Sequence, residues 1–159
     1  MADVSPFRHA TPDDSAGFLL WKLTTLWQRR LALVFDSYGI TQTQYAILAS
    51  LRWFEERHEP TTQALLAEHA RLEPMTLSKA IRRLADDGLV TRDQSAEDSR
   101  ALSVRLTSKG RKLTQKAVVT IEDADAAFFG SLGVRELSTY KALVVKLIEG
   151  VAQGLLQRQ

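Results

Sequence analysis

The sequence of 159 residues contains no cysteine. This absence excludes disulfide bonds, thiolate metal sites and redox sensing through thiols. The sequence also has no apolar run of about 18 residues, the length that a membrane-spanning helix requires. Its first residues lack the basic segment and the apolar stretch of a secretory signal. We therefore expect a cytoplasmic protein with a hydrophobic core of its own.

The chain has little excess charge, because 21 Lys and Arg residues stand against 19 Asp and Glu residues and leave a net charge of +2. DNA binding must then be inferred from local clusters of positive charge, not from the net charge. The sequence also lacks a phosphate-binding glycine loop, a nucleophile elbow and an H-E-x-x-H motif. We expect no catalytic residue and no cofactor, and the scattered His9, His58 and His69 predict no metal site.

Apolar side chains recur at steps of three and four along six segments, which predicts six amphipathic helices. The predicted helices cover residues 16–37, 41–57, 61–70, 75–87, about 108–129 and about 134–157. The predicted inner face of the first helix consists of Leu20, Leu23, Trp27, Leu31 and Val34. Gly39 and Gly88 mark helix ends, and Thr41 is a predicted N-cap.

Between Gly88 and the fifth helix the apolar period changes to two. Leu102, Val104 and Leu106 alternate with the polar Ser103 and Arg105. We therefore expect a strand with the three apolar side chains buried and the two polar ones exposed. Together with residues 89–94 it forms a predicted β-hairpin, and residues 95–100 form its projecting tip.

The fold class predicted from this order is mainly α with a small β-hairpin wing. Residues 38–110 form a winged helix-turn-helix lobe, and residues 15–37 and 111–157 supply the long helices that flank it. These flanking helices carry more apolar surface than one small domain covers.

The helix predicted over residues 75–87 carries side chains suited to DNA. With a step of 100° per residue, Leu77, Ile81 and Leu84 share one face. The opposite face and its shoulder carry short hydroxyls and long cations, which contact base edges and phosphates in a major groove. The predicted DNA-binding residues of this helix are Thr76, Ser78, Lys79, Arg82 and Arg83.

Arg100 stands where the tip of the predicted hairpin meets its second strand. A wing beside a major-groove helix lies over the adjacent minor groove, and a narrow A·T-rich minor groove attracts arginine. We expect Arg100 to enter that groove. Asp98, two residues earlier, is placed to orient the guanidinium or to pair with another arginine.

The stretch "EPMTLSKAIRRLADDGLVTRDQSAEDSRALSVRLTSKGRKL" resembles the centre of the MarR family of winged-helix repressors. The resemblance rests on D-G-L-V-x-R after the recognition helix, D-x-R at the hairpin tip and L-T-x-x-G before the next helix. "ITQTQYAILASL" similarly resembles that family's second helix. The family resemblance implies a homodimer on a pseudo-palindromic operator, with residues 15–37 and 111–157 as the dimerisation region. It places DNA contacts at the helix residues named above and at Asp98 and Arg100.

The resemblance also implies release of DNA by a small aromatic or phenolic ligand. The aromatic side chains that we expect to line its pocket are Trp21, Trp27, Tyr38, Tyr45 and Trp53. Arg29, Arg30 and Arg52 are candidates to hold a carboxylate, and nothing in the sequence selects among them. An alternative function stays open, a winged-helix module that binds an acidic protein partner through the same basic face. DNA binding would differ from it by a steep salt dependence.

Overall fold

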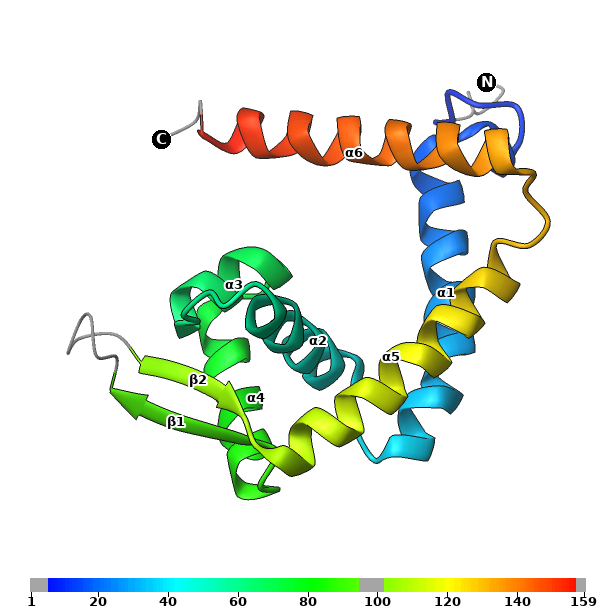
Figure 1. Ribbon diagram of the computed structural model, residues 1–159. Helices are drawn as coiled ribbons and strands as arrows, with labels where there is room; N and C mark the ends of the chain where they lie inside the picture. The colour runs from blue at the N-terminus through cyan, green and yellow to red at the C-terminus, as the bar shows by residue number, and fades with distance from the viewer. Residues whose placement is uncertain (1–5, 95–101, 157–159) are drawn as a thin grey trace. The chain divides into compact units, whose positions relative to one another are not determined.

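Figure 1 shows the computed structural model, in which residues 6–94 and 102–156 are described. A 3-10 helix, Pro12–Asp14, precedes α1 (Ala16–Tyr38), α2 (Gln42–Glu56), α3 (Gln63–Ala70) and α4 (Pro74–Asp86). The strands β1 (Val90–Gln94) and β2 (Leu102–Leu106) come next, followed by α5 (Ser108–Phe128) and α6 (Val134–Leu156). The predicted fold class, mainly α with a β-hairpin wing, is confirmed.

The chain divides into two compact units, Met1–Glu122 and Asp123–Gln159. The first unit contains α1 to β2 and most of α5, and the second contains the end of α5 and α6. None of the helices in the described part of the chain has the length and apolar character needed to cross a membrane.

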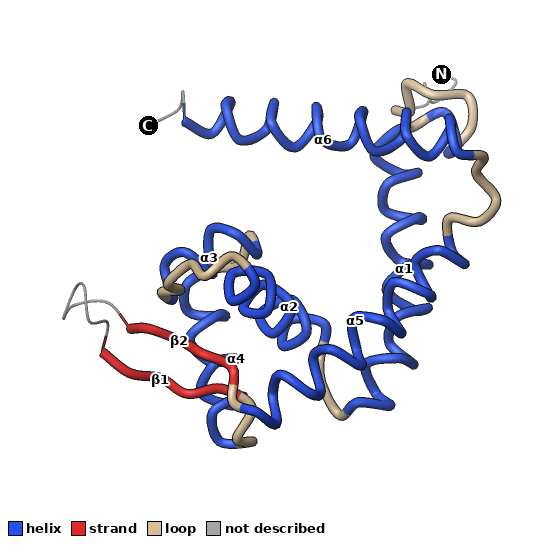
Figure 2. Tube along the Cα trace, in the orientation of Figure 1, coloured by secondary structure: helices blue, strands red, loops and turns tan. Residues whose placement is uncertain are grey.

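The core of the first unit lies where α2, α3 and α4 pack against one another (Figure 2). The hairpin closes this core, because β2 packs against α2 and α3 while β1 packs against α4. The fully buried side chains include Ile47, Leu48, Leu66, Leu77, Ile81, Leu84 and Val104. This packing holds α4 at the surface of the lobe, with one face of the helix turned inward.

Local capping explains why α2 begins where it does. The Thr41 hydroxyl accepts a hydrogen bond from the Gln44 N–H at 3.1 Å, and the Gln44 side chain accepts one from the Thr41 N–H at 2.9 Å. This reciprocal pair satisfies donors that the first turn of a helix leaves free. Gly39 ends α1 in the left-handed region, with φ of 63°. The short turn between the two helices is therefore defined by its own residues.

The second strand of the hairpin differs from its prediction at two residues. Val104 and Leu106 are buried as expected, but Leu102 is 36% exposed and Ser103 only 9% exposed. The reason is a third extended segment, since Thr62 forms a β-bridge with Ser103 and the Val104 N–H donates to the Thr61 carbonyl at 3.0 Å. This segment covers Ser103, whereas Leu102 is the first residue of β2.

Much apolar surface on α1 and α6 is exposed. In α1 only Leu31 and Phe35 are buried, and Leu20, predicted to face inward, is 66% exposed. Among the α6 residues whose burial is described, none is buried. Its exposed apolar side chains include Leu143, Val145, Leu147, Ile148 and Val151. The apolar periodicity of these helices therefore marks surface that the single chain leaves uncovered.

Candidate nucleic-acid interface

The inner face of α4 anchors the helix to the core. Leu77, Ile81 and Leu84 are each at most 1% exposed. Pro74 occupies the first turn, where its missing N–H costs nothing. Gly88, with φ of 70°, follows the helix and lets the chain turn into β1. These features leave the opposite face of α4 as the part that meets solvent.

That outer face carries the five DNA-binding residues predicted for α4. Thr76, Lys79, Arg82 and Arg83 are exposed and Ser78 is half-buried. The Arg82 guanidinium donates to the Ser78 hydroxyl at 3.3 Å, and Arg83 Nε lies 3.4 Å from Asp87 Oδ2. Both arginines are exposed, and these surface interactions, one hydrogen bond and one ion pair, contribute little stability. Each guanidinium can therefore exchange its partner for a phosphate or a base edge.

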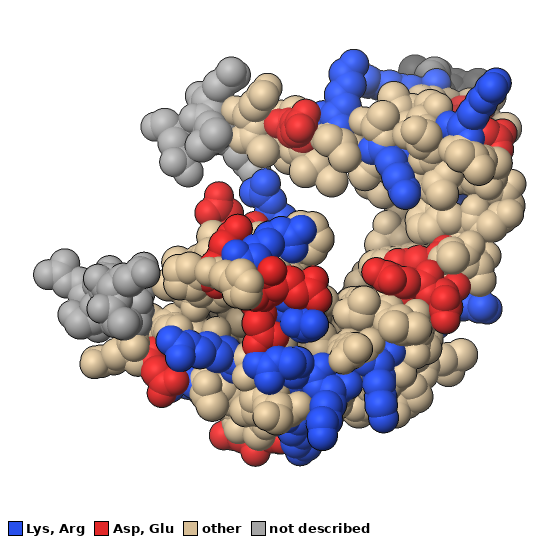
Figure 3. All heavy atoms as spheres, in the orientation of Figure 1, with Lys and Arg blue, Asp and Glu red and all other residues tan. Residues whose placement is uncertain are grey.

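The predicted wing pair, Asp98 and Arg100, lies outside the described residues. The strands themselves place Arg105 on the exposed face, opposite Thr91 of β1. Arg92 is half-buried, and its Nε is buried without a hydrogen-bond partner. In Figure 3, Lys and Arg side chains gather over the hairpin and the first turns of α5, while Asp and Glu gather over the later turns of α5. Local charge clusters therefore exist despite the small net charge.

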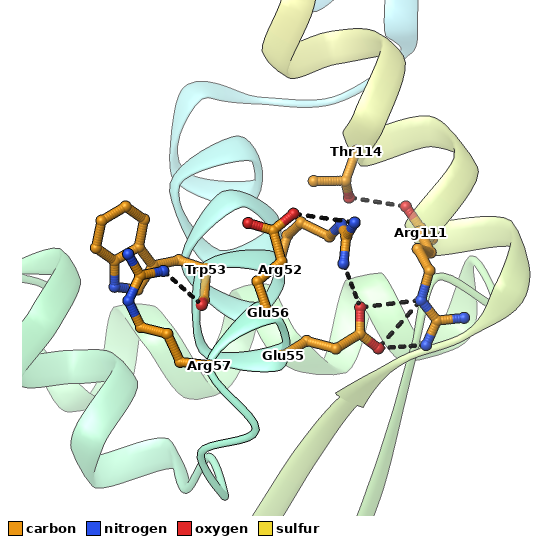
Figure 4. A network of polar contacts seen from close by, with 8 residues as sticks. Arg52, Trp53, Glu55, Glu56, Arg57, Arg111 and Thr114 are labelled. Atoms are coloured by element: carbon orange, nitrogen blue, oxygen red, sulfur yellow. Dashed lines mark hydrogen bonds and ion pairs between the residues drawn. The ribbon is translucent and has the colours of Figure 1, made fainter.

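A polar network that the sequence did not reveal joins α2 to the start of α5 (Figure 4). Arg111 Nε donates to both carboxylate oxygens of Glu55, at 2.9 and 3.1 Å, and its Nη2 donates to Glu55 Oε1 as well. On the other side, Arg52 pairs with Glu55 at 3.2 Å and with Glu56 at 3.0 Å. The network therefore connects α2 of the winged-helix lobe directly to α5.

This network shifts the pKa values of Glu55 and Arg111 in the directions that favour their charged forms. Hydrogen bonds from Arg111 lower the pKa of the Glu55 carboxyl below its usual value; partial burial opposes this, and Arg52 adds to the lowering. The same contact with Glu55 raises the pKa of Arg111. Both groups are therefore charged at neutral pH. The sequence shows that Glu55 and Arg111 are oppositely charged. It does not show that they pair, because they are 56 positions apart.

Four of the aromatic side chains predicted to line a ligand pocket have separate neighbours. Trp21 stacks on Phe18 with ring centroids 5.7 Å apart, and Tyr45 packs on Phe35 at 5.5 Å. The Arg57 guanidinium lies 3.2 Å from the centroid of Trp53. The Tyr38 hydroxyl lies 2.7 Å from Thr120 Oγ1. Trp27 is half-buried on α1. Of the candidate carboxylate-binding arginines, Arg52 is engaged with Glu55 and Glu56.

The histidines give no sign of a metal site in the described part of the chain. No group of three or more His, Cys, Asp or Glu side chains there is close enough to hold an ion. His69 instead packs edge-on against Phe54, with ring centroids 4.9 Å apart.

Residues 36–125 match the family model described as ArnR1-like, winged-helix domain. The HTH-type transcriptional regulator YdcH of Bacillus subtilis is 30% identical over 125 residues, which cover 79% of this chain and 85% of that protein. An HTH-type transcriptional repressor of Mycobacterium tuberculosis is 27% identical over 135 residues, 85% of this chain and 94% of the relative. The chain thus spans most of the length of both relatives.

Solved structures share the fold. A mutant of MarR from E. coli, complexed with operator DNA, superposes with a TM-score of 0.73 at 23% identity, and the match covers 82% of this chain and 91% of that one. BpsR of Bordetella bronchiseptica, solved to explain regulation of its DNA binding by 6-hydroxynicotinic acid, superposes with a TM-score of 0.78 at 22% identity, covering 90% and 97%. With the winged-helix family model matched over more than half of its length, this chain belongs to the MarR family of winged-helix transcriptional regulators.

Proposed function

We propose that the protein is a homodimeric repressor that binds a pseudo-palindromic operator. The observation that carries the proposal is the two-faced character of α4. Its apolar side chains Leu77, Ile81 and Leu84 are buried, while its hydroxyls and cations point outward on the second helix of a helix-turn-helix. A helix with this outer face meets the requirements of major-groove binding.

The proposed contacts follow from the side chains. Arg82, Arg83 and Lys79 reach guanine edges or phosphates, and Thr76 and Ser78 hydrogen-bond to either. In a two-fold dimer the two α4 helices enter successive major grooves about 34–36 Å apart, one turn of DNA. Arg100 enters the flanking minor groove, with Asp98 orienting its guanidinium or pairing with another arginine.

The exposed apolar surface supports the homodimer. Trp21 is 62% exposed and Leu147 69% exposed, and further apolar side chains surround each of them on α1 and α6. Contiguous apolar patches of this kind mark interfaces, and identical chains most often cover them by two-fold association. We therefore propose that a second copy covers α1 and α6.

Release by a small aromatic acid is the finer part of the proposal. BpsR, a neighbour in fold, has its DNA binding regulated by 6-hydroxynicotinic acid. A ligand that changes the spacing of the two lobes needs to favour the non-binding spacing by only about 1–3 kcal/mol. Titration with a panel of phenolic acids should quench tryptophan fluorescence if Trp21, Trp27 or Trp53 borders the site. No response across the panel would argue against these residues.

The first experiment is a gel shift and footprint on the intergenic DNA beside the gene of this protein, at two salt concentrations. A protected two-fold site of about two helical turns, weakening steeply with salt, is the expected result. Absence of protection at low salt, with excess protein and nearby promoters included, would contradict the proposal. It would favour the alternative, a module that binds an acidic protein partner through its basic face.

A further inference from the structure

Charge is segregated along α5. Its first fourteen residues, 108–121, contain Lys109, Arg111, Lys112 and Lys116 and no acidic residue, whereas Glu122, Asp123 and Asp125 follow. The first two thirds of the helix thus carry only positive charge, within a chain that is nearly neutral overall.

Three of these four cations form an exposed row. Arg111 is engaged with Glu55, but Lys109, Lys112 and Lys116 are exposed and lie at spacings of three and four, on one side of the helix. We call these three residues the lysine ridge. Within the described chain, no acidic side chain forms an ion pair with any of them. Their charges are therefore available to a partner.

The lysine ridge begins at the end of α4. Lys109 Nζ donates to the Asp87 carbonyl, at 2.8 Å, just after the last turn of that helix. Lys109 and Arg83 line one depression together with Tyr38. Tyr38 also lines a second depression, of about 550 Å³, with Lys112 and Lys116. The two depressions thus share Tyr38, with Arg83 of α4 in the first and Lys112 and Lys116 of the ridge in the second.

The charges of the first depression nearly cancel. Asp86 and Asp87 line it beside Arg83 and Lys109, and Asp87 is paired with Arg83. The second depression has no acidic lining residue. The excess of positive charge on this surface therefore lies at Lys112 and Lys116, and these are the two residues to substitute in a test.

We propose that the lysine ridge binds phosphates of the DNA backbone beside the groove that α4 enters. This inference rests on the proposed function. From Lys109 to Lys116 the helix rises about 10 Å, roughly three of the 3.4 Å steps between successive phosphates of one strand. Lysine suits this task because it binds phosphate as a point charge without demanding a fixed geometry. Such contacts position the protein and add affinity without reading sequence.

The test is the salt dependence of binding to a fluorescein-labelled duplex of mixed sequence, which requires no known operator. The double variant Lys112→Gln/Lys116→Gln is compared with Arg135→Gln/Lys141→Gln, which removes the same charge from exposed positions of α6 that do not line its apolar groove. The ridge variant should bind more weakly. The slope of log K against log salt should become shallower by about 0.9 for each phosphate that is no longer neutralised, about 1.8 for each bound protomer. The α6 variant should keep the wild-type slope.

If the ridge variant and the wild type have equal salt slopes, the proposal that the lysine ridge binds phosphates is wrong. It is also wrong if the slope of the α6 variant changes as much as that of the ridge variant. These results would leave the proposed function intact, provided that Arg82→Ala still weakens binding. Failure of the wild type to bind the duplex in a salt-dependent manner would overturn the proposed function and the ridge together. Circular dichroism melts of both double variants check that each is folded, as expected for substitutions at exposed positions.

Discussion

At the scale of single residues, Arg82 is the side chain whose role in DNA recognition is tested most directly. It is exposed on α4 and is not among the buried residues, and within the described chain its hydrogen bond is to the Ser78 hydroxyl at 3.3 Å. Arg82→Ala should weaken operator binding by about 1–3 kcal/mol and relax the preference at one base position if Arg82 reads a base. The measurement is the affinity for the operator and for its single-base variants.

Arg135→Ala is the matched control, because it removes an exposed arginine from α6. A uniform loss across all operator variants would assign Arg82 to a phosphate instead of a base. Equal affinity of Arg82→Ala and wild type would contradict the placement of α4 in the groove.

Glu55 predicts a pH dependence of stability. Arg111 lowers the pKa of its carboxyl in the folded state below the ordinary 4.5, so the ion pair stabilises the fold above that pH. This contribution is lost as the pH falls through the folded-state pKa. The side chain of Glu55 is 33% exposed, so solvent screens the pair and the effect is small. Glu55→Gln should lower Tm at pH 7 by about 2 °C.

The difference in Tm between wild type and Glu55→Gln should stay constant from pH 7 to pH 5 and shrink below pH 4.5. Thermal melts across this range measure it. Glu68→Gln serves as a control, because Glu68 is exposed and forms none of the ion pairs in the described chain. A difference that grows on acidification would have the wrong sign for this ion pair.

At the scale of elements, the junction of β2 with α5 depends on Gly110. A Cβ at this position would lie 1.9 Å from the Leu89 carbonyl oxygen. That oxygen already accepts the Thr107 N–H at 3.1 Å, so it cannot move away without breaking a hydrogen bond. Gly110→Ala should therefore destabilise the protein by about 1–3 kcal/mol. Denaturant unfolding gives this free energy.

Gly154 provides the matched control, since a Cβ there meets no atom within 4 Å. Gly154→Ala should stabilise α6 by about 0.5–1 kcal/mol, because alanine has less backbone freedom to lose than glycine. If the two substitutions change the free energy of unfolding similarly, the backbone around Gly110 and Leu89 must move apart at little cost.

The elements themselves were predictable because each carries its own periodicity and caps. The first helix was predicted over residues 16–37 and runs over Ala16–Tyr38, and the hairpin was located by its period of two. The burial of Ser103 was not predictable, since it depends on Thr62, far away in the sequence. The Glu55–Arg111 pair was missed for the same reason. Local pattern defines an element, but its neighbours decide which of its side chains are covered.

The same limit applies to the site. The outer face of α4 followed from periodicity alone, because three buried residues determine where the other side chains point. The lysine ridge did not, since its connection to α4 runs through a contact between Lys109 and the Asp87 carbonyl. The aromatic candidates stay a prediction. Within the single chain, Tyr45 packs on Phe35 and Trp53 contacts Arg57.

At the scale of the whole molecule, the uncovered face of α6 predicts how the protein associates. Leu147 and Val151 are 69% and 64% exposed and line one apolar groove with Leu143 and Gly150. Each such side chain contributes about 1.5–3 kcal/mol when it is fully buried. A glutamate in its place would have to be buried without a partner, at a cost that the dimer cannot offset.

Leu147→Glu/Val151→Glu should therefore convert a dimer into a monomer of 17.8 kDa in sedimentation experiments. Ser138→Glu/Gln153→Glu, which adds the same charge at exposed polar positions of α6, should remain dimeric. Because two separate monomers bind the two half-sites independently, affinity for a two-fold operator should fall by about 10²–10⁴-fold. Binding of a single half-site should be much less affected, since α4 and the lysine ridge are intact. A wild type that sediments as a monomer, or a Leu147→Glu/Val151→Glu variant that stays dimeric, would mean that α6 serves another partner.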